Sequence, residues 1–338
     1  MTTQQAPFVS IVISCHNRPT ETEHAIRTLQ SQDFSDWELI LIDNGSTDTS
    51  VAHLTPLAEQ DSRIQLTAIT RTYVADARNI GISKANPDAK YVMVHDDDDW
   101  LFTGALSKLV KKALENPAAV CVYGMAQHCN NNGDATETLE TCFGWVRFGV
   151  RSNGQIYKLK DIDNDTFESL VVWCSIATMA QVLIRHDVLK QEGGFNKECG
   201  ISDDWDLWIR LSRVGTFVRI PEFTLHKRMN GSNLSQKREL LRTAERSMRL
   251  RLKFNKTLSQ SQKKSARMGI FVSNIMHLRW IAEALQHKKY GYAAITLAQV
   301  GVRILRGFYL CFVAGPPYVS ESPQDMTLGM PTLGRRKP

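Results

Sequence analysis

Apolar runs and helical stripes alternate along the first third of the chain. Short apolar stretches rich in β-branched residues predict strands, and they lie at 8–15, 37–43, 63–69, 91–94 and 119–124. Helical patterns separate them at 20–30, 74–86 and 100–115. Thr20 and Glu23 have the spacing of a capping box at the start of the first helix. Strands that alternate with helices predict βαβ units and a mostly parallel sheet.

The pattern changes in the second half of the chain. Residues 140–185 are irregular, with aromatic side chains and short strand-like runs, and a helix is expected from Asp203 to Gly215. From about residue 236 to residue 307 the pattern is basic and helical. The last twenty residues combine Pro, Gly and Arg and predict a mobile tail. We therefore expect an α/β domain at 1–235 and a basic helical region at 236–338.

The distribution of charge supports this division. The net charge of the 338 residues is +6. Residues 1–235 hold 22 basic and 30 acidic residues, a net of −8, whereas residues 236–338 hold 19 basic and 5 acidic residues, a net of +14. Opposite charges on the two parts predict that they have different partners.

Composition excludes several classes of protein. Apolar residues make up 43% and charged residues 22%, which is typical of a globular protein and excludes a disordered or collagen-like chain. The seven cysteines include no C-x-x-C pair, so reduced thiols in a cytoplasmic protein are expected. The first ten residues do not resemble a signal peptide, and the late apolar stretch at 290–315 is interrupted by arginines, so we expect no membrane-spanning helix.

An acidic segment directly after the strand at 91–94 is the most specific motif. It consists of four adjacent carboxylates, Asp96, Asp97, Asp98 and Asp99. Neighbouring carboxylates in a partly buried loop repel one another, so their ionisation requires a cation, strong donors or water. Carboxylate oxygens are hard ligands that suit Mg²⁺ or Mn²⁺. An acidic cap on the helix at 100–115 accounts for Asp99 but not for all four residues, so metal binding is favoured.

A second polar site ends the strand at 37–43. Asp43 and Asn44 stand there, immediately before Gly45. A strand followed by a glycine turn can present polar groups to a nucleoside at the carboxyl edge of the sheet. An Asn-Gly turn without any ligand explains the same residues equally well.

A third acidic site begins the helix expected at 203–215. Asp203 and Asp204 lie in its first turn, where an acidic cap is the simplest interpretation. Asp204 is four residues before Trp208 and therefore faces the apolar stripe of the helix. A carboxylate held against an aromatic surface has a raised pKa, which suits a general base.

Taken in order, these motifs resemble the inverting family 2 glycosyltransferases of the GT-A fold, over roughly residues 8–235. The resemblance rests on six segments in the same order, namely VSIVISCHNR, ELILIDNGSTD, ARNIGISKA, HDDDDWL, GGFN and SDDWDLWIRL. It implies a Rossmann-like sheet flanked by helices, a nucleotide-sugar donor, most commonly a UDP-sugar, and Mg²⁺ or Mn²⁺ as the cofactor. The basic region at 236–338 is then a helical extension of that fold.

The resemblance also implies a role for each site residue. Asp96 and Asp98 match the D-x-D metal site, with Asp98 the stronger ligand candidate and Asp99 in support. The donor nucleotide is expected to be contacted by Asp43, Asn44, Arg78, Asn79, Asp96 and Asp97. Asp204 matches the catalytic base, and Asp203 matches the acid before it. The implied reaction is a single displacement that inverts the anomeric carbon, in the biosynthesis of a polysaccharide or glycolipid.

Three departures from the family pattern shape these expectations. Asn44 stands where the family commonly has Asp, which leaves the nucleotide base open. The chain lacks the Gln-x-x-Arg-Trp element of the processive synthases, so transfer of single sugars is expected. His226 precedes Asn230-Gly231-Ser232 by four residues, where it either approaches the metal or is structural.

Two other functions remain as alternatives. A nucleotidyltransferase also uses an α/β sheet, carboxylates and a metal, but no glycine-rich phosphate loop with a following Lys appears after the first strand. A degenerate transferase that serves as a non-catalytic binding subunit is the second alternative.

The basic C-terminal region has its own set of interpretations. Its cations belong to a solvated helical face, to a surface for anionic lipids or to a surface for nucleic acid. Nothing at 237–267 resembles a nucleic-acid-binding motif with interleaved base-stacking aromatics, so nucleic acid is not expected. The stretch at 290–313 combines aromatic and aliphatic bulk with Arg303 and Arg306, which suits an interfacial helix or packing in a homodimer. An interfacial helix would agree with a saccharide or lipid-linked saccharide acceptor at the cytoplasmic face of an inner membrane.

Overall fold

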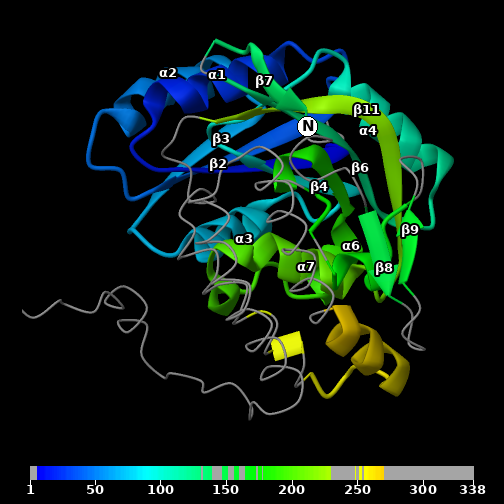
Figure 1. Cartoon of the computed structure of the whole chain (residues 1–338). Coiled ribbons are helices and arrows are strands. Elements are labelled where there is room, and N and C mark those ends of the chain that lie inside the picture. The colour runs from blue at the N-terminus through cyan, green and yellow to red at the C-terminus, as the bar shows by residue number, and fades with distance from the viewer. Residues whose placement is uncertain are drawn as a thin grey trace, which may run out of the picture.

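The computed structural model confirms an α/β fold, with a mixed sheet covered by helices on both faces (Figure 1). It describes residues 6–130, 132–138, 147–150, 156–159, 164–172, 174–176, 178–229, 248, 251–252 and 255–269. The helices expected at 270–307, the interfacial stretch at 290–313 and the tail lie outside the described residues.

The elements follow one another as strands and helices in near alternation. The strands are β1 (Val9–Cys15), β2 (Trp37–Asn44), β3 (Ile64–Ile69), β4 (Tyr91–Asp96), β5 (Trp100–Leu101), β6 (Ala119–Cys129), β7 (Ala135–Thr138), β8 (Arg147–Val150), β9 (Ile156–Leu159), β10 (Val182–Arg185) and β11 (Thr216–Arg228). The α-helices are α1 (Pro19–Gln30), α2 (Ser50–Gln60), α3 (Val74–Lys84), α4 (Ala105–Glu115), α5 (Phe167–Leu170), α6 (His186–Gln191) and α7 (Asp203–Leu211). Two 3₁₀-helices are η2 (Met179–Gln181) and η3 (Lys197–Ser202).

The main sheet has the strand order β3-β2-β1-β4-β10-β6-β11-β5, and β7 pairs with β6. Strands β1 to β4 are parallel, as expected. The second half is mixed, because β10 runs antiparallel to both β4 and β6. The carboxyl ends of β1, β2 and β4 meet at one edge, where the register pairs Cys15 with Asp43 and Ser14 with Asp96.

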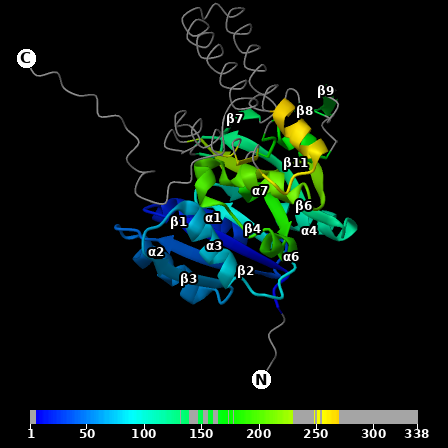
Figure 2. The same ribbon diagram turned by 90° about the horizontal axis from the view of Figure 1, so that it is seen from below.

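Helices close the two faces of the sheet with separate apolar clusters. On one face, side chains of α1, α2 and α4 pack on alternate residues of β1 such as Ile11 and Ile13. On the other face, α3, α6 and α7 pack on residues such as Val12 and Ile42. The two groups of helices lie on opposite sides of the sheet in Figure 1, and in the view from below in Figure 2 helices α3 and α7 lie in front of the strands. The central strands β1, β2 and β4 are apolar on both sides because both faces are buried there.

Two expected helix starts are wrong. Helix α1 begins at Pro19 after Arg18 and has no side-chain cap, so the capping box of Thr20 does not form. The segment expected to begin a helix at residue 100 is instead the short strand β5, which pairs with β11, and α4 begins five residues later. Asp99 is therefore not a helix cap, and its Oδ1 accepts a hydrogen bond from the backbone N–H of Arg228.

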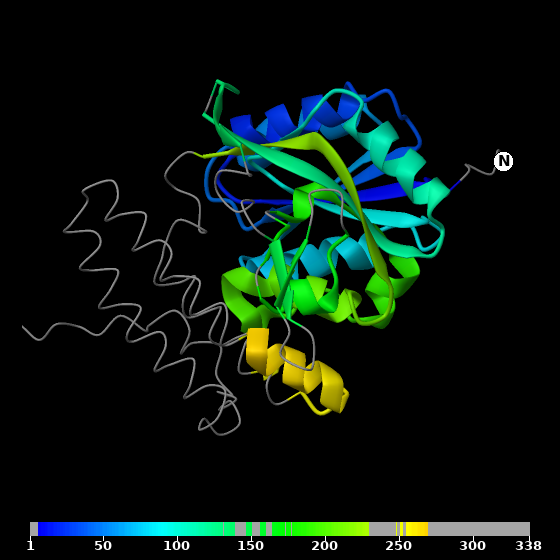
Figure 3. The same ribbon diagram turned by 45° about the vertical axis from the view of Figure 1, so that its right-hand side comes forward.

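Two features of the second half were not predicted. Strand β11 has 13 residues and runs parallel to β6 with register shifts. Downstream of it, the described residues Met248, Leu252, Leu258 and Ala266 are buried in the same cluster as α7. The helix that contains Ala266 lies below α7 in Figure 3. Among the described residues, no helix is long and apolar enough to span a membrane.

Candidate active site at the carboxyl edge of the sheet

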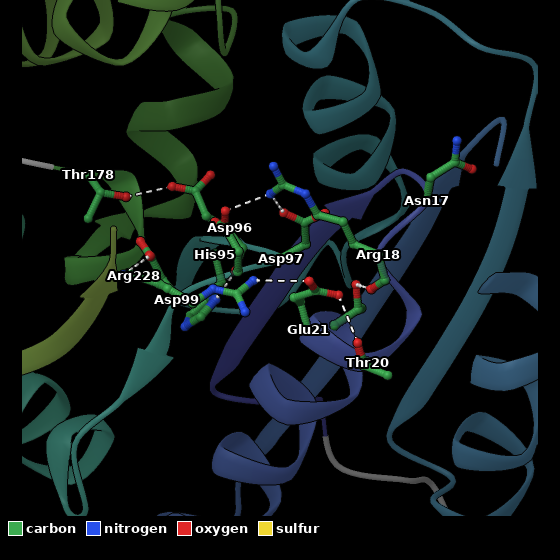
Figure 4. A network of polar contacts seen from close by, with 12 residues as sticks. Asn17, Arg18, Thr20, Glu21, His95, Asp96, Asp97, Asp99, Thr178 and Arg228 are labelled. Carbon is green, nitrogen blue, oxygen red and sulfur yellow. Dashed lines mark hydrogen bonds and ion pairs between the residues drawn. The ribbon is translucent and has the colours of Figure 1, made fainter. Parts of the chain in front are cut away.

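The four carboxylates at the end of β4 are held by groups from several parts of the fold. Asp96 Oδ1 accepts from Arg78 at 3.0 Å, and its Oδ2 accepts from the hydroxyl of Thr178 at 2.6 Å. The dashed line from Thr178 to Asp96 in Figure 4 marks the second contact. Because Arg78 and Thr178 outweigh the effect of burial, the pKa of Asp96 is lowered. Asp96 is therefore a stable anion at neutral pH.

For the next three carboxylates, burial prevails over the nearby positive charges, and the pKa is raised. It raises the pKa of Asp97 to about 7, against the attraction of Arg18. It also raises the pKa of Asp98, again opposed by Arg18. The pKa of Asp99 is raised well above its ordinary value by burial and by the charges of Asp96 and Asp98. Burial therefore disfavours the charged form of all three carboxylates, and a cation bound beside them would favour it.

The second site, at the end of β2, is built around backbone hydrogen bonds. Asp43 Oδ2 accepts from the backbone N–H of Ser46 at 3.0 Å. Asn44 is buried, and its amide pairs with the backbone of Thr72, donating to the carbonyl at 3.1 Å and accepting from the N–H at 2.9 Å. Gly45 has φ +68, and a Cβ there would lie 2.6 Å from the backbone nitrogen of Arg71. Asn44 thus ties the end of β2 to the loop before α3.

Asp203 and Asp204 begin α7 side by side with unlike surroundings. Asp203 is buried and accepts from Arg78 at 2.9 Å. Asp204 is partly exposed, and its Oδ1 accepts from the backbone N–H of Trp205. Burial of the carboxyl group, followed by the charge of Asp203, raises the pKa of Asp204 to about 7. A carboxylate with this pKa can take a proton at neutral pH and release it afterwards.

Helix α7, which begins with these two carboxylates, is fixed to the core by its tryptophans. Trp205 donates from its indole to the carbonyl of Leu170 at 2.6 Å, and Trp208 is fully buried. Asp206 and Arg210 form an ion pair one turn apart, at 2.8 Å. The raised pKa of Asp204 agrees with the expectation, although its leading causes are burial and Asp203.

Arg78 connects the acidic segment after β4 to α7. Its guanidinium contacts both Asp96 and Asp203, so it lies between two of the three predicted sites. Asn79, the next residue, has a different role in the structure. Its amide accepts from the backbone N–H of Phe195 and donates to the carbonyl of the same residue, both at 2.8 Å.

The two hydrogen bonds between Asn79 and Phe195 tie the GGFN segment at 193–196 to α3. A Cβ on Gly194, whose φ is +70, would lie 2.4 Å from the Oδ1 atom of Asn79. The close approach of this turn requires glycine.

The ring of His226 is stacked against the aromatic rings of Phe102 and Trp100. Its ring lies 3.6 Å from that of Phe102 and 5.5 Å from that of Trp100, centroid to centroid. Burial lowers its pKa, so the ring is neutral. The contacts favour the structural interpretation of His226.

The carboxylates fit a hard divalent cation in kind and in charge. Among the residues that the structure describes, no three His, Cys, Asp or Glu side chains form a ready-made metal cage. Mg²⁺ in nucleotide sites commonly takes one or two carboxylates and completes its shell with phosphates and water. Asp96 and Asp98 could supply such a pair, since both offer hard carboxylate oxygens and the charge of Asp96 acts on Asp98.

Sequence analysis missed three residues of this site. Arg18 contacts Asp97 and Asp98, Thr178 contacts Asp96, and Arg228 contacts Asp99 through its backbone. Arg18 lies directly after β1, at the same sheet edge as the other sites, so its position was a usable indication. Thr178 comes from the irregular region, and no sequence pattern placed it.

The family model described as glycosyl transferase family 2 matches residues 10–185. The matched range includes the acidic segment Asp96–Asp99, the turn that begins at Asp43, and Arg78. The chain belongs to glycosyl transferase family 2.

Similar glycosyltransferases of known sequence agree with this membership. An uncharacterized glycosyltransferase of Haemophilus influenzae is 23% identical over 69% of this chain and 68% of its own length. The GalNAc(5)-diNAcBac-PP-undecaprenol beta-1,3-glucosyltransferase of Campylobacter jejuni is 35% identical over 34% of this chain and 37% of its own. The hyaluronan synthase of Pasteurella multocida is 23% identical over 69% of this chain, which is only 22% of that larger enzyme.

Solved glycosyltransferases share the fold. The mannosyltransferase PcManGT of Pyrobaculum calidifontis, in complex with GDP-Man and Mn²⁺, has a TM-score of 0.58 at 13% identity and covers 89% of this chain and 87% of its own. S. aureus TarS residues 1–349, in complex with UDP-GlcNAc, has a TM-score of 0.55 at 12% identity, over 78% and 71% of the two chains. The family 2 member described here is thus a glycosyltransferase with a GT-A-like fold.

Proposed function

We propose that this family 2 glycosyltransferase is a metal-dependent, inverting and non-processive enzyme. It moves one sugar from a nucleoside diphosphate donor to an acceptor hydroxyl in the synthesis of a polysaccharide or glycolipid. The observation that carries the proposal is the double contact of Arg78, which joins the acidic segment at Asp96 to the start of α7 at Asp203. The proposed donor-binding segment and the helix that carries the proposed base are therefore joined through one arginine.

Asp204 acts as the general base in this proposal. Its Oδ1 is engaged by the backbone of α7, so Oδ2 is the oxygen that takes the proton from the acceptor hydroxyl. As that proton leaves, the acceptor oxygen forms a bond to the anomeric carbon, and the bond from this carbon to the diphosphate breaks. The nucleoside diphosphate departs on the opposite face, which inverts the anomeric carbon. Asp203 and Arg78 hold the base in place without touching the sugar.

The acidic segment binds the donor in this proposal. Asp98 and Asp96 would hold Mg²⁺ or Mn²⁺, and the cation supplies positive charge to the diphosphate leaving group. Asp43 and Asn44 border the nucleoside at the neighbouring strand end, with Asn44 acting through the Thr72 loop. A UDP-sugar is the first donor to test, and GDP-mannose is the second, because these classes bind the two structural neighbours.

Metal-dependent release of a nucleoside diphosphate tests this function. The full chain is incubated with a panel of UDP-, GDP- and dTDP-sugars, with MnCl₂, MgCl₂ or EDTA, and the released diphosphate is measured. We expect release with one donor class, its loss with EDTA, and its loss in Asp204→Asn. Equal release with EDTA would contradict metal dependence. No release from any donor, together with intact donor binding, would support the non-catalytic subunit.

We further propose that the basic C-terminal part holds the enzyme at an anionic membrane surface, at the cytoplasmic face of the membrane. Residues 250–269 contain six Lys or Arg and no Asp or Glu. Lys256, Lys264 and Arg267 are exposed, whereas Ala266 is buried against the catalytic domain. The Campylobacter jejuni relative is named for an undecaprenol-linked acceptor, so a lipid-linked saccharide is the acceptor to test first.

Co-sedimentation with liposomes tests the membrane proposal. Each Lys or Arg near an anionic bilayer contributes about 1 kcal/mol of attraction, which salt screens. We expect binding to phosphatidylglycerol vesicles at low salt, weaker binding at high salt and none to neutral vesicles. A protein that stays in solution with anionic vesicles at low salt would contradict this proposal.

A further inference from the structure

The guanidinium of Arg18 contacts the two central carboxylates of the acidic segment, Asp97 and Asp98. Its Nη1 atom lies 2.9 Å from Asp97 Oδ1 and 2.6 Å from Asp98 Oδ2. Figure 4 shows Arg18 beside Asp97, with a dashed line between the two side chains. The Asp98 side chain is only 9% exposed, so this pair is largely shielded from water.

The backbone around Arg18 is built to hold it there. Asn17 has a left-handed conformation with φ +53, which costs a non-glycine residue free energy. Its backbone N–H donates to Ser46 Oγ at 2.9 Å, and its side-chain Oδ1 accepts from the N–H of Thr47 at 2.8 Å. The carbonyl of Arg18 accepts from the N–H of Thr22 at 3.1 Å, inside the first turn of α1. The placement of Arg18 is therefore supported on both sides.

Arg18 performs the electrostatic task that a metal ion would perform. Asp97 and Asp98 are adjacent buried carboxylates, and each opposes the ionisation of the other. One nitrogen of Arg18 contacts both of them, so a single positive charge is shared between two carboxylates. A divalent ion at Asp98 would have to take over that contact, because two cations cannot share one carboxylate edge without repulsion.

We propose that Arg18 is a resident cation that occupies Asp98 in the donor-free enzyme and is displaced from it when the metal and the nucleotide bind together. This inference rests on the proposed metal site at Asp98. A bare divalent ion must break the Arg18–Asp98 pair and gains only one or two protein ligands in return. An ion that arrives with a diphosphate brings further oxygen ligands, while Arg18 keeps its contact with Asp97. Arg18 thus makes metal binding depend on the donor.

Removal of the resident cation should uncouple the two ligands. In Arg18→Met, we expect MnCl₂ alone to bind at least about fivefold more tightly than to the unmodified protein, which is the lower end of typical coupling between two sites. Arg18→Lys should restore weak binding, because one nitrogen suffices for both contacts. Arg27→Met is the matched control: it removes the same charge from α1, the helix that begins directly after Arg18, but Arg27 pairs with Glu23 on the exposed side. It should leave the affinity unchanged.

The measurement is the Mn²⁺ dissociation constant of the full chain, by calorimetry or electron paramagnetic resonance, without nucleotide and with UDP or GDP. Unchanged or weaker Mn²⁺ binding in donor-free Arg18→Met would overturn the inference. If the unmodified protein binds no Mn²⁺ even with either nucleotide, the proposed metal site fails as well.

Should Arg18→Met not fold, the comparison moves to Arg18→Met/Asp97→Asn against Asp97→Asn. The double variant removes a cation and a carboxylate together, so the charge balance of the site is kept. Tighter Mn²⁺ binding in the double variant supports the inference, and equal binding overturns it.

Discussion

Arg78 and Asp203, 125 residues apart in the sequence, form an ion pair with 2.9 Å between Nη1 and Oδ2. The same guanidinium reaches Asp96 through Nη2 at 3.0 Å. The Arg78 side chain is 12% exposed and that of Asp203 3% exposed. One buried side chain on α3 thereby joins the end of β4 to the start of α7, which are the two halves of the proposed active site.

Loss of Arg78 should destabilise the fold strongly. Arg78→Met leaves buried Asp203 and partly exposed Asp96 without their shared cation, and removal of one partner from a buried pair such as Arg78–Asp203 costs about 3–5 kcal/mol of unfolding free energy. Urea denaturation measures this difference. Lys108→Met, which breaks the exposed pair with Glu222, is the control and should cost less than about 1 kcal/mol. The Arg78→Met/Asp203→Asn double variant should lose less than the sum of the single changes; strict additivity would contradict a direct pair.

Asp204→Asn should abolish sugar transfer while donor binding survives. An amide cannot take the proton from the acceptor, and a positioned base contributes about 10²–10⁴-fold to the rate. The turnover rate and the donor dissociation constant are measured on the same preparation. Asp206→Asn is the matched control, because it makes the same change on the same helix but at a residue paired with Arg210. Near-normal turnover by Asp204→Asn would remove this residue from its proposed role.

The rate of transfer should rise with pH through about 7. The pKa of Asp204 is raised to about 7 by burial and by Asp203, so the base is protonated and inactive below that pH and ionised above it. In Asp203→Asn, a neighbouring negative charge is lost, ionisation of Asp204 becomes easier, and the acid limb should move to lower pH. The pH profile of kcat/KM measures this shift. A limb that stays in place, or moves to higher pH, would separate Asp204 from the observed ionisation.

We expect Asn79 to stabilise the fold by holding the GGFN turn at 193–196. In Asn79→Ala, both hydrogen bonds to the backbone of Phe195 are lost, which should cost about 1–3 kcal/mol of unfolding free energy. The donor dissociation constant should change little, because both polar atoms of the amide are already engaged. Thermal denaturation and donor titration together test this. A stable variant with weak donor binding would support the direct nucleotide contact that the family resemblance implies.

Local patterns were sufficient to predict the parallel half of the sheet. Strands β1, β2 and β4 are buried almost throughout, so they appear as continuous apolar runs such as Val9–Cys15, whereas β3 at the edge of the sheet mixes buried and exposed residues. The second half could not be predicted in this way. Strand β11 contains Pro221 and Glu222 and pairs with β6 through register shifts, so its sequence lacks a regular alternation.

The sequence by itself determined the α/β class, the family and the positions of Asp43, Asp96 and Asp204, because strand ends and helix starts are local features that adjacent residues encode. Only the tertiary structure decided the partners of these residues. Arg78 joins Asp96 to Asp203, and Asn79 turns to the backbone of Phe195. Such contacts depend on how the elements pack, since residues more than a hundred positions apart leave no mark on the local pattern. The same packing raises the pKa of Asp204 to about 7, because burial and a nearby charge act through space and not along the chain.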